Sequence, residues 1–380
     1  FANRYRVVFR HPGSRFICNL SRNEGCSQPI FESWKNIALI MTPIAKVSVI
    51  VPVYNVEQYF EKCLRSLFGQ TLQQIEYLFI DDRTPDKSIA LLNKVLSDYP
   101  LREPYVKIIV QPQNLGQGAA RKRGMEEATG EYVIHCDSDD WIEPDMYESM
   151  YNTAIQENAD IVCCDRWVEL TGKSIHVSYP YEKETLDMLS QCEVFMLFPA
   201  LWNKLVRRQL YITHACYPFE GINMWEDRGV SVRLRYYSSK TVVLRKPFYH
   251  YNQTNSHSIG KNVTKEHIRQ EMACAHYVER FFKQQGENVY NRFTLPIASL
   301  KFESKSSLLT NPNTRNLEKW KAIYPETHQF VMRYTNLSLI SRLLFRIAIF
   351  NPAVGCFLFD WKRRIGNKIR HLKKVINIMQ

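Results

Sequence analysis

Between Lys46 and Asp165, short apolar runs typical of strands alternate with segments whose apolar residues recur at helical spacing. Short runs rich in β-branched residues, typical of strands buried on both faces, occur at 46–54, 75–82, 106–111, 131–137 and 159–165. Between them, apolar residues recur at helical spacing, beginning with Phe60, Leu64 and Leu67 and continuing in 88–99, 116–128 and 144–158. Strands that alternate with helices indicate right-handed crossovers and a largely parallel α/β sheet.

The start of the first helix carries a candidate cap. Asn55 is followed three positions later by Gln58, a spacing similar to a capping box. We expect the Asn55 side chain to cap this helix.

Four polar segments follow the strands and should meet at one edge of the sheet. They are "PVYN" (52–55), "DDRTPD" (81–86), "QNLGQGAARKRG" (113–124) and "DSDD" (137–140). Ligands of such sheets bind beyond the carboxyl ends of the strands. The sequence therefore predicts a ligand site here, although Asp and Ser are also ordinary turn residues.

The carboxylates of "DSDD" indicate the kind of ligand. Asp137 and Asp139 would repel each other unless a cation lay between them. Oxygen ligands at this spacing suit Mn²⁺ or Mg²⁺ together with a diphosphate. No G-x-G-x-x-G follows the first strand and no Walker A motif is present, which argues against a dinucleotide fold and a P-loop enzyme.

Composition and charge narrow the class of protein. The 45% hydrophobic content indicates a folded protein with a substantial core. The net charge of +12 belongs to the two ends, since residues 1–40 carry six Lys/Arg against two Glu and residues 341–380 carry nine against one Asp. The remainder is neutral, which argues against nucleic acid as a partner. The ten cysteines show no disulfide or zinc spacing and favour a reduced, cytoplasmic setting.

The first 45 residues lack clear periodicity. The chain begins with Phe1, and its first methionine is Met41. We interpret 1–45 as a disordered or non-native extension; a loosely ordered arm of the natural protein is the alternative.

Together these motifs resemble the family 2 glycosyltransferases, which have the GT-A fold. The resemblance covers 46–170 closely and 195–255 more loosely, through "VSVIVPVYN", "IDDRTPD", "NLGQGAARKRG" and "DSDDW". It implies a Rossmann-like sheet flanked by helices, a nucleotide-sugar donor and a metal held by Asp139 and Asp137. The implied donor-binding residues are Pro52, Val53, Tyr54, Asn55, Asp81, Asp82, Asn114, Gly116, Arg121, Asp137, Ser138 and Asp139.

Two positions depart from the family pattern. Arg83 stands where the family usually has a glycine, and Lys122 where it often has an asparagine. Both lie near the expected nucleotide. Asp82 is expected to hold the base, commonly a uracil, and Asp140 to cap the local turn.

The second half of the resemblance supplies candidates for catalysis. In "MWEDRG", the family implies Asp227 as the general base and Glu226 as a support; acids at a helix N-terminus are the plainer interpretation. Trp225 is a candidate acceptor contact or a core residue, and Lys204 a phosphate contact or a surface lysine. His250 is a candidate third metal ligand or a core histidine.

The implied protein is an inverting, metal-dependent hexosyl- or N-acetylhexosaminyltransferase. It would use a UDP-sugar and a saccharide acceptor, carried on a lipid, in cell-surface polysaccharide synthesis. A nucleotidyltransferase of similar fold and a non-catalytic carbohydrate-binding protein are the alternatives.

The C-terminal part is expected to be helical. We predict a catalytic domain at 46–255, with a nucleotide-binding half (46–165) and an acceptor half (166–255), then a helical extension at 256–340. Residues 341–380 form a basic tail, in which Ile365, Ile369, Leu372, Ile376 and Met379 recur at helical spacing. Such a helix lies on an anionic membrane surface, at the inner face of the cell membrane; docking on the protein's own core is the alternative.

Overall fold

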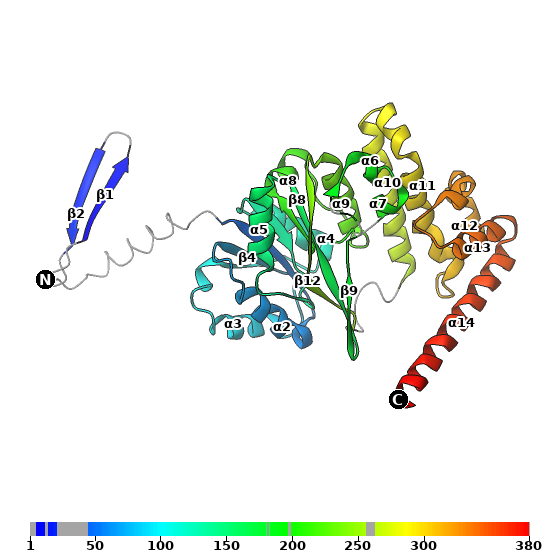
Figure 1. The fold of residues 1–380 in the computed structure, drawn as a ribbon, viewed down its shortest axis with the longest axis horizontal. Helices are drawn as coiled ribbons and strands as arrows, with labels where there is room; N and C mark the ends of the chain where they lie inside the picture. Colours follow the sequence, from blue (N-terminus) through cyan, green and yellow to red (C-terminus); the bar gives the residue numbers. More distant parts are fainter. Residues whose placement is uncertain are drawn as a thin grey trace. The chain divides into compact units, whose positions relative to one another are not determined.

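The structure is a computed structural model of the 380-residue chain. It describes residues 5–11, 14–20, 45–179, 181, 183–196, 199–255 and 263–379, and for 5–11, 14–20, 183, 193 and 367–379 it describes the backbone alone. Residues 1–43 and 44–380 form two compact units. Figure 1 shows the fold of both.

The first unit contains a β-hairpin that the sequence analysis did not predict. Strands β1 (Tyr5–His11) and β2 (Ser14–Leu20) pair antiparallel, with Tyr5 opposite Leu20. The pair Pro12-Gly13, a common turn signal, lies between them in the sequence. This signal could have revealed the hairpin.

The second unit contains the predicted alternation of strands and helices. Its first part comprises β3 (Val47–Val53), α2 (Glu57–Phe68), β4 (Ile75–Asp81), α3 (Ser88–Leu96), η1 (Glu103–Tyr105), β5 (Val106–Val110), α4 (Gln117–Glu127), β6 (Tyr132–His135), β7 (Trp141–Ile142), α5 (Met146–Gln156) and β8 (Ile161–Leu170). Every strand and helix predicted between 46 and 165 is confirmed, with ends that differ by a few residues.

The sheet is mixed, with parallel pairs among β6, β3, β4 and β5 and between β8 and β12. Its order is β10-β12-β8-β11-β6-β3-β4-β5. Strand β11 (Lys204–Arg207) lies antiparallel between β6 and β8. The remaining strands are β9 (Lys173–Val177), β10 (Lys183–Glu184) and β12 (Thr241–Asn252). The local period of β11 could not reveal this insertion, because pairing between distant strands depends on tertiary packing.

Helices cover both faces of the sheet. Alternate residues of β3 contact opposite layers, so that Val49 packs with α2, α3 and α5, and Ile50 packs with α4, α8 (Arg208–His214) and α9 (Glu226–Tyr237). The two layers fix the strands and thereby the loops at their carboxyl ends.

The start of α2 differs from the predicted cap. Asn55 has φ +54°, and the N-cap is Val56, which makes no side-chain cap bond. Instead, the Asp86 carboxylate accepts a hydrogen bond from the Glu57 backbone N–H at 2.8 Å. A side chain from the neighbouring strand end, rather than a local capping box, therefore satisfies this helix N-terminus.

The C-terminal part is helical. It comprises α10 (Lys265–Gln284), α11 (Glu287–Thr310), α12 (Leu317–Ala322), η3 (Pro325–Arg333), α13 (Leu339–Phe350) and α14 (Pro352–Met379), after two short helices, α6 (Leu186–Leu189) and α7 (Cys192–Met196). Helices α10 and α11 pack around Phe282 and Phe293, whose ring centroids lie 4.3 Å apart. Among the described residues, no helix combines the length and apolarity that crossing a membrane requires.

Candidate active site

A cavity of about 1030 Å³ opens at the carboxyl ends of β3, β4 and β6. It is also lined by residues of α4, α9 and α10. Most of the predicted site residues meet here: Pro52, Val53, Tyr54, Asn55, Asp82, Asn114, Gly116, Arg121, Asp137, Ser138, Asp139, Trp225, Glu226 and Asp227. Asp81, Lys204 and His250 are not among its lining residues.

Arg121 connects the two acidic groups of the cavity. Its side chain is 2% exposed, and it donates from Nη2 to Asp137 Oδ1 at 2.7 Å and from Nε to Glu226 Oε1 at 3.2 Å. Burial disfavours its charge, but Asp137 and Glu226 outweigh burial and raise the pKa of Arg121. Its buried Nη1 has no hydrogen-bond partner in the described part of the chain. Arg121 thus fixes the two groups relative to each other and keeps one donor unused.

Glu226 and Asp227 begin α9. The preceding residue, Trp225, has φ +66°, and this left-handed turn starts the helix at the cavity wall. Glu226 is 5% exposed, and burial and the adjacent Asp227 raise its pKa to about 8, with Arg121 opposing them. Asp227 is half-buried and accepts a hydrogen bond from the Arg228 backbone N–H at 2.6 Å. Burial therefore disfavours the ionised form of Glu226, and the half-buried Asp227 is the carboxylate more open to the cavity.

Asp82 has a contact that the sequence did not reveal. Its two carboxylate oxygens accept from the backbone N–H groups of Leu115 and Gly116, each at 2.8 Å. Gly116 has φ +87°, and a Cβ there would lie 2.3 Å from the Asn223 side chain, so the position requires glycine. Asp82 therefore holds the loop that leads into α4 and positions Arg121.

Arg83, which stands where the family usually has a glycine, has a backbone conformation that glycine favours. Its φ is +58°, in the left-handed region that glycine favours, and its Nε donates to the Pro112 carbonyl at 3.3 Å. The departure from the family pattern therefore leaves the turn after β4 in a glycine-like conformation.

The aspartates after β6 divide into two kinds. Asp140 is 1% exposed and accepts from the Tyr249 hydroxyl and the Asn252 backbone N–H, both at 2.7 Å. Burial, followed by Asp139 and Asp137, raises its pKa well above the usual range. Asp140 ties the turn to β12, whereas Asp137 and Asp139 line the cavity.

The segment after β12 also contributes to the cavity. Asn255, which the sequence analysis did not single out, donates from Nδ2 to Asp139 Oδ2 at 2.8 Å and lines the cavity. One sequence signal could have identified Asn255. It lies shortly after His250, in the segment that was expected to complete the site.

His250 itself points to other partners. Its Nδ1 lies 2.8 Å from Glu169 Oε1 and its Nε2 lies 3.0 Å from Glu143 Oε1, while its ring stacks on Trp141. Both ring nitrogens are engaged by carboxylates away from Asp137, so the structure does not support His250 as a third metal ligand.

Lys204 and Asp81 also differ from their predicted places. Lys204 is 1% exposed on β11, where Nζ donates to the Ala200 carbonyl at 2.8 Å, and burial lowers its pKa to about 8. It is neither a surface lysine nor a residue of the cavity wall. Asp81 accepts from the Thr84 backbone N–H at 2.9 Å and stabilises the turn after β4.

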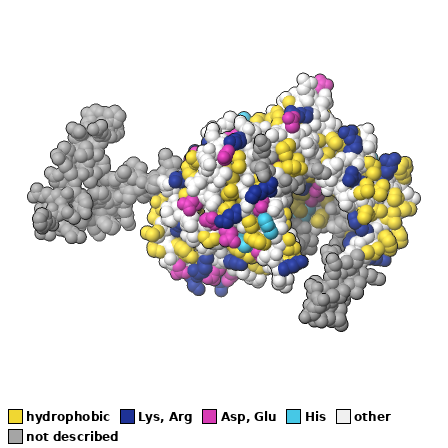
Figure 2. Space-filling view, in the orientation of Figure 1, with side chains coloured by type: hydrophobic (Ala, Val, Ile, Leu, Met, Phe, Trp, Pro, Cys, Tyr) yellow, Lys and Arg dark blue, Asp and Glu magenta, His cyan; other side chains and the backbone are white. Residues whose placement is uncertain are grey.

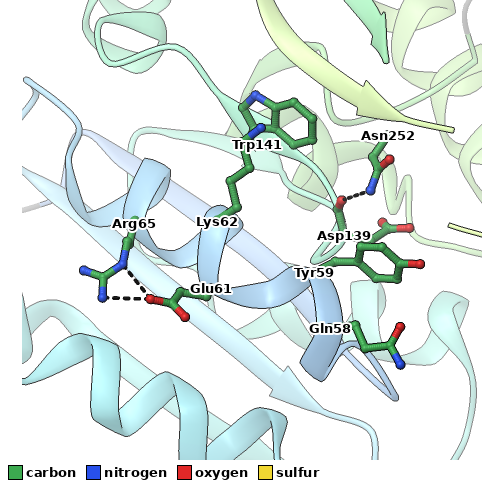
Figure 3. Close-up of a pocket in the computed structure, with 8 residues that line it drawn as sticks. All are labelled: Gln58, Tyr59, Glu61, Lys62, Arg65, Asp139, Trp141 and Asn252. Atoms are coloured by element: carbon green, nitrogen blue, oxygen red, sulfur yellow. Dashed lines mark hydrogen bonds and ion pairs between the residues drawn. The ribbon is translucent and has the colours of Figure 1, made fainter. Parts of the chain in front are cut away.

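A smaller cavity of about 450 Å³ is also lined by Asp139. Figure 3 shows its wall, in which Lys62 of α2 extends toward Trp141 and Asn252 contacts Asp139. Lys62 Nζ lies 3.1 Å from the centroid of a Trp141 ring. Asp139 therefore borders both cavities.

Comparisons with known proteins agree with this arrangement. Residues 48–190 match the model of the family described as glycosyl transferase family 2. EpsH of Bacillus subtilis is 35% identical over 216 residues, which cover 54% of this chain and 60% of EpsH. The cholesterol galactosyltransferase of Borreliella burgdorferi is 27% identical, over 66% of this chain and 72% of that protein. The chain spans about 60% of the first curated relatives that it matches.

A solved structure shares the fold. The crystal structure of residues 1–349 of TarS from S. aureus, in complex with UDP-GlcNAc, has a TM-score of 0.60 with 18% identity, and the match covers 84% of this chain and 92% of TarS 1–349. The mixed sheet, its flanking helices and this match identify the GT-A fold. Residues 48–190, which include the strand ends that line the cavity, are similar to glycosyl transferase family 2.

Proposed function

We propose that the protein is an inverting glycosyltransferase that moves a hexose or N-acetylhexosamine from a UDP-sugar to a saccharide acceptor. The observation that carries the proposal is the Arg121 bridge, which joins Asp137 of the donor side to Glu226 of the helix that bears Asp227. A donor diphosphate beside Asp137 and a base at Asp227 would then share one cavity. Uridine is the first choice because TarS structures contain UDP-GlcNAc and UDP.

The proposed reaction is an in-line displacement at the anomeric carbon. Asp227 takes the proton of the acceptor hydroxyl as its oxygen bonds to that carbon, while the bond to the diphosphate oxygen breaks. UDP leaves with the electron pair of that bond. Arg121, through its unused Nη1, is suited to a phosphate or base contact.

A divalent metal fits the donor side. Asp137 and Asp139 both line the cavity, and the described residues contain no group of three or more His, Cys, Asp or Glu side chains able to hold an ion. Two carboxylates are enough for Mn²⁺ or Mg²⁺, which commonly complete their coordination with substrate phosphates and water. When bound, the ion would neutralise charge on the departing diphosphate.

A screen of nucleotide sugars tests the proposal. UDP-, GDP- and dTDP-sugars are incubated with the protein in Mn²⁺, in Mg²⁺ or in excess EDTA, and release of nucleoside diphosphate is measured. We expect at least one UDP-sugar to be hydrolysed with metal and not with EDTA. Release of pyrophosphate from UTP and a sugar 1-phosphate would instead indicate a nucleotidyltransferase. Sugar binding without turnover of any donor would indicate a non-catalytic protein.

We further propose that the protein associates peripherally with an anionic membrane, where a lipid-linked acceptor of polysaccharide synthesis would be found. Apolar side chains are exposed along α13 and the start of α14: Leu339, Ile340, Leu343, Ile347, Phe350, Val354, Phe357 and Trp361. Figure 2 shows hydrophobic side chains gathered where Figure 1 places these helices. The opposite side packs on the core through Phe345 and Ala348. Of the predicted tail residues, those beyond Ile365 have side chains outside the described part.

The charge of this surface suits anionic lipid. Between 339 and 366 the sequence has five basic residues, Arg342, Arg346, Lys362, Arg363 and Arg364, and one acid, Asp360. Asp360 pairs with Arg315 at 2.9 Å. An apolar surface bordered by unbalanced positive charge is typical of helices that lie in the membrane interface.

We expect Phe350→Glu/Phe357→Glu to reduce binding to vesicles that contain phosphatidylglycerol by more than about tenfold. Burial of each phenylalanine in lipid would contribute about 1.5–3 kcal/mol. Co-sedimentation with vesicles measures the effect. Leu101→Glu is a matched control, since Leu101 is 83% exposed but far from α13 in sequence and lies in the nucleotide-binding half. Deletion of 361–380 should also weaken binding. Equal sedimentation of all variants would contradict the proposal.

A further inference from the structure

Glu271 of α10 is a buried carboxyl group at the cavity wall. It is 7% exposed and lines the cavity with Met224, Trp225 and Asp227. Among the described residues, neither of its oxygens takes part in a hydrogen bond or an ion pair. Burial raises its pKa to about 7, with Arg228 opposing this effect and Glu303 adding to it. A carboxyl group with no partner is costly to bury, unless a ligand supplies the partner.

The nearby cation is already engaged. Arg228 donates from Nη1 to Glu303 Oε1 at 3.2 Å, and its guanidinium lies 4.1 Å from the centroid of the Trp225 ring. The Arg228 guanidinium therefore hydrogen-bonds to α11 and lies over Trp225, and among the described residues its charge acts on Glu271 without a hydrogen bond or an ion pair.

Helix α10 is fixed to the cavity wall beside Glu271. The Gln270 side-chain oxygen accepts from the backbone N–H groups of Asn223 and Met224, at 2.9 and 3.0 Å. Asn223 in turn accepts from the Gly118 N–H of α4 at 2.9 Å, and Cys274 Sγ donates to the Trp225 carbonyl at 3.3 Å. These contacts on both sides of Glu271 fix its backbone relative to Asp227.

The proposed reaction assigns a side of the cavity to each substrate. In an in-line displacement, the acceptor hydroxyl attacks opposite the departing diphosphate, which the proposed function locates beside Asp137 and Asp139. The base and the acceptor therefore share the wall formed by α9 and α10. Glu271 belongs to that wall.

We propose that Glu271 binds hydroxyl groups of the acceptor and selects a neutral sugar ring. The inference rests on the proposed function. An ionised carboxylate can accept hydrogen bonds from two neighbouring hydroxyls, a pair that most hexopyranosides present. The carboxylates of Glu271 and Asp227, when ionised, give this wall negative charge, so it disfavours a uronate or a phosphorylated sugar at the same position. Trp225 offers an apolar surface for the ring beside it.

Saturation-transfer NMR tests this without turnover. Methyl glycosides of glucose, galactose, mannose and N-acetylglucosamine are added to the full chain with UDP and Mn²⁺, and methyl glucuronide serves as the charged analogue. We expect at least one neutral glycoside to bind and the glucuronide to bind more weakly. Glu271→Gln should weaken binding of the neutral glycoside by about 10- to 100-fold, the effect of losing hydrogen bonds to a charged group.

Glu266→Gln is the matched control, since Glu266 lies on the same helix, outside the cavity, and pairs with Arg269. This variant should bind like the unmodified chain. Glu271→Asp, which keeps the charge but shortens the side chain, should be intermediate and serves if Glu271→Gln does not fold. Binding that is equal in Glu271→Gln and in the unmodified chain, or no glycoside bound by the unmodified chain, would overturn the proposal. Hydrolysis of UDP-sugars by the unmodified chain is measured separately, so failure of the proposed function is distinguished from failure of this assignment.

Discussion

Asp227→Asn should lower turnover by about 10²–10⁴-fold, the contribution of a positioned general base. An acceptor hydroxyl is a poor nucleophile at neutral pH, and the amide keeps the size of the side chain while removing its basicity. The loss corresponds to about 3–5 kcal/mol of barrier, at about 1.4 kcal/mol for each tenfold change. The affinity for the donor should change little, because Asp227 lies at the start of α9 and the proposed donor contacts lie at the strand ends. Steady-state release of UDP from the best donor of the screen gives both quantities.

Glu226→Gln is the comparison for this prediction. Glu226 is buried, receives a hydrogen bond from Arg121 and has a pKa raised to about 8, because burial disfavours its ionised form. We therefore expect Glu226→Gln to lower turnover less than Asp227→Asn does, and to weaken acceptor binding more. A greater loss of turnover in Glu226→Gln would move the base one residue earlier. If neither variant loses more than a few-fold, the base lies elsewhere.

Asp139→Asn should weaken Mn²⁺-dependent binding of UDP by at least about 100-fold. Mutation of a residue that only orients a metal ligand lowers metal affinity or activity by about 10–100-fold. Asp139 is proposed to be a ligand itself, so its loss should have at least the larger of these effects. Its carboxylate borders both cavities and accepts a hydrogen bond from Asn255, which an amide can replace in part without unfolding the turn. Titration calorimetry with UDP, with and without Mn²⁺, measures the affinity.

Asp145→Asn is the control for that prediction, since Asp145 lies nearby in sequence but pairs with Lys246 away from the cavities. It should bind UDP as the unmodified chain does. Unchanged affinity in Asp139→Asn, or equal UDP binding by the unmodified chain in excess chelator, would contradict the metal assignment.

The sequence by itself determined the first, α/β part of the fold. The strands and helices between 46 and 165 could be predicted because each has its own apolar period, and that period is a local property. The polar loops at the strand ends followed, since parallel strands bring their carboxyl ends to one edge of the sheet. The meeting of Asn55, Asp82, Asn114 and Asp139 at one cavity was therefore predictable.

Other features depended on contacts between distant segments. The Arg121 bridge joins residues that are 105 positions apart, and no local period reports such a pair. The antiparallel insertion of β11 depends on pairing with β6 and β8, and the loop contact of Asp82 depends on how the turn after β4 meets the segment before α4. Glu271 comes from a helix beyond the part that matches the family model.

His250 shows why residue type alone could not identify the side chains that face the ligand. The segment around it does reach the cavity, through Asn255, but the alternation of side chains along β12 and the carboxylates of Glu143 and Glu169 direct the His250 ring elsewhere. Residue type and position in the sequence therefore determined the chemistry available to the site. The tertiary structure decided which of those groups face the ligand, because a side chain is directed by the face of its strand and by the partners that reach it first.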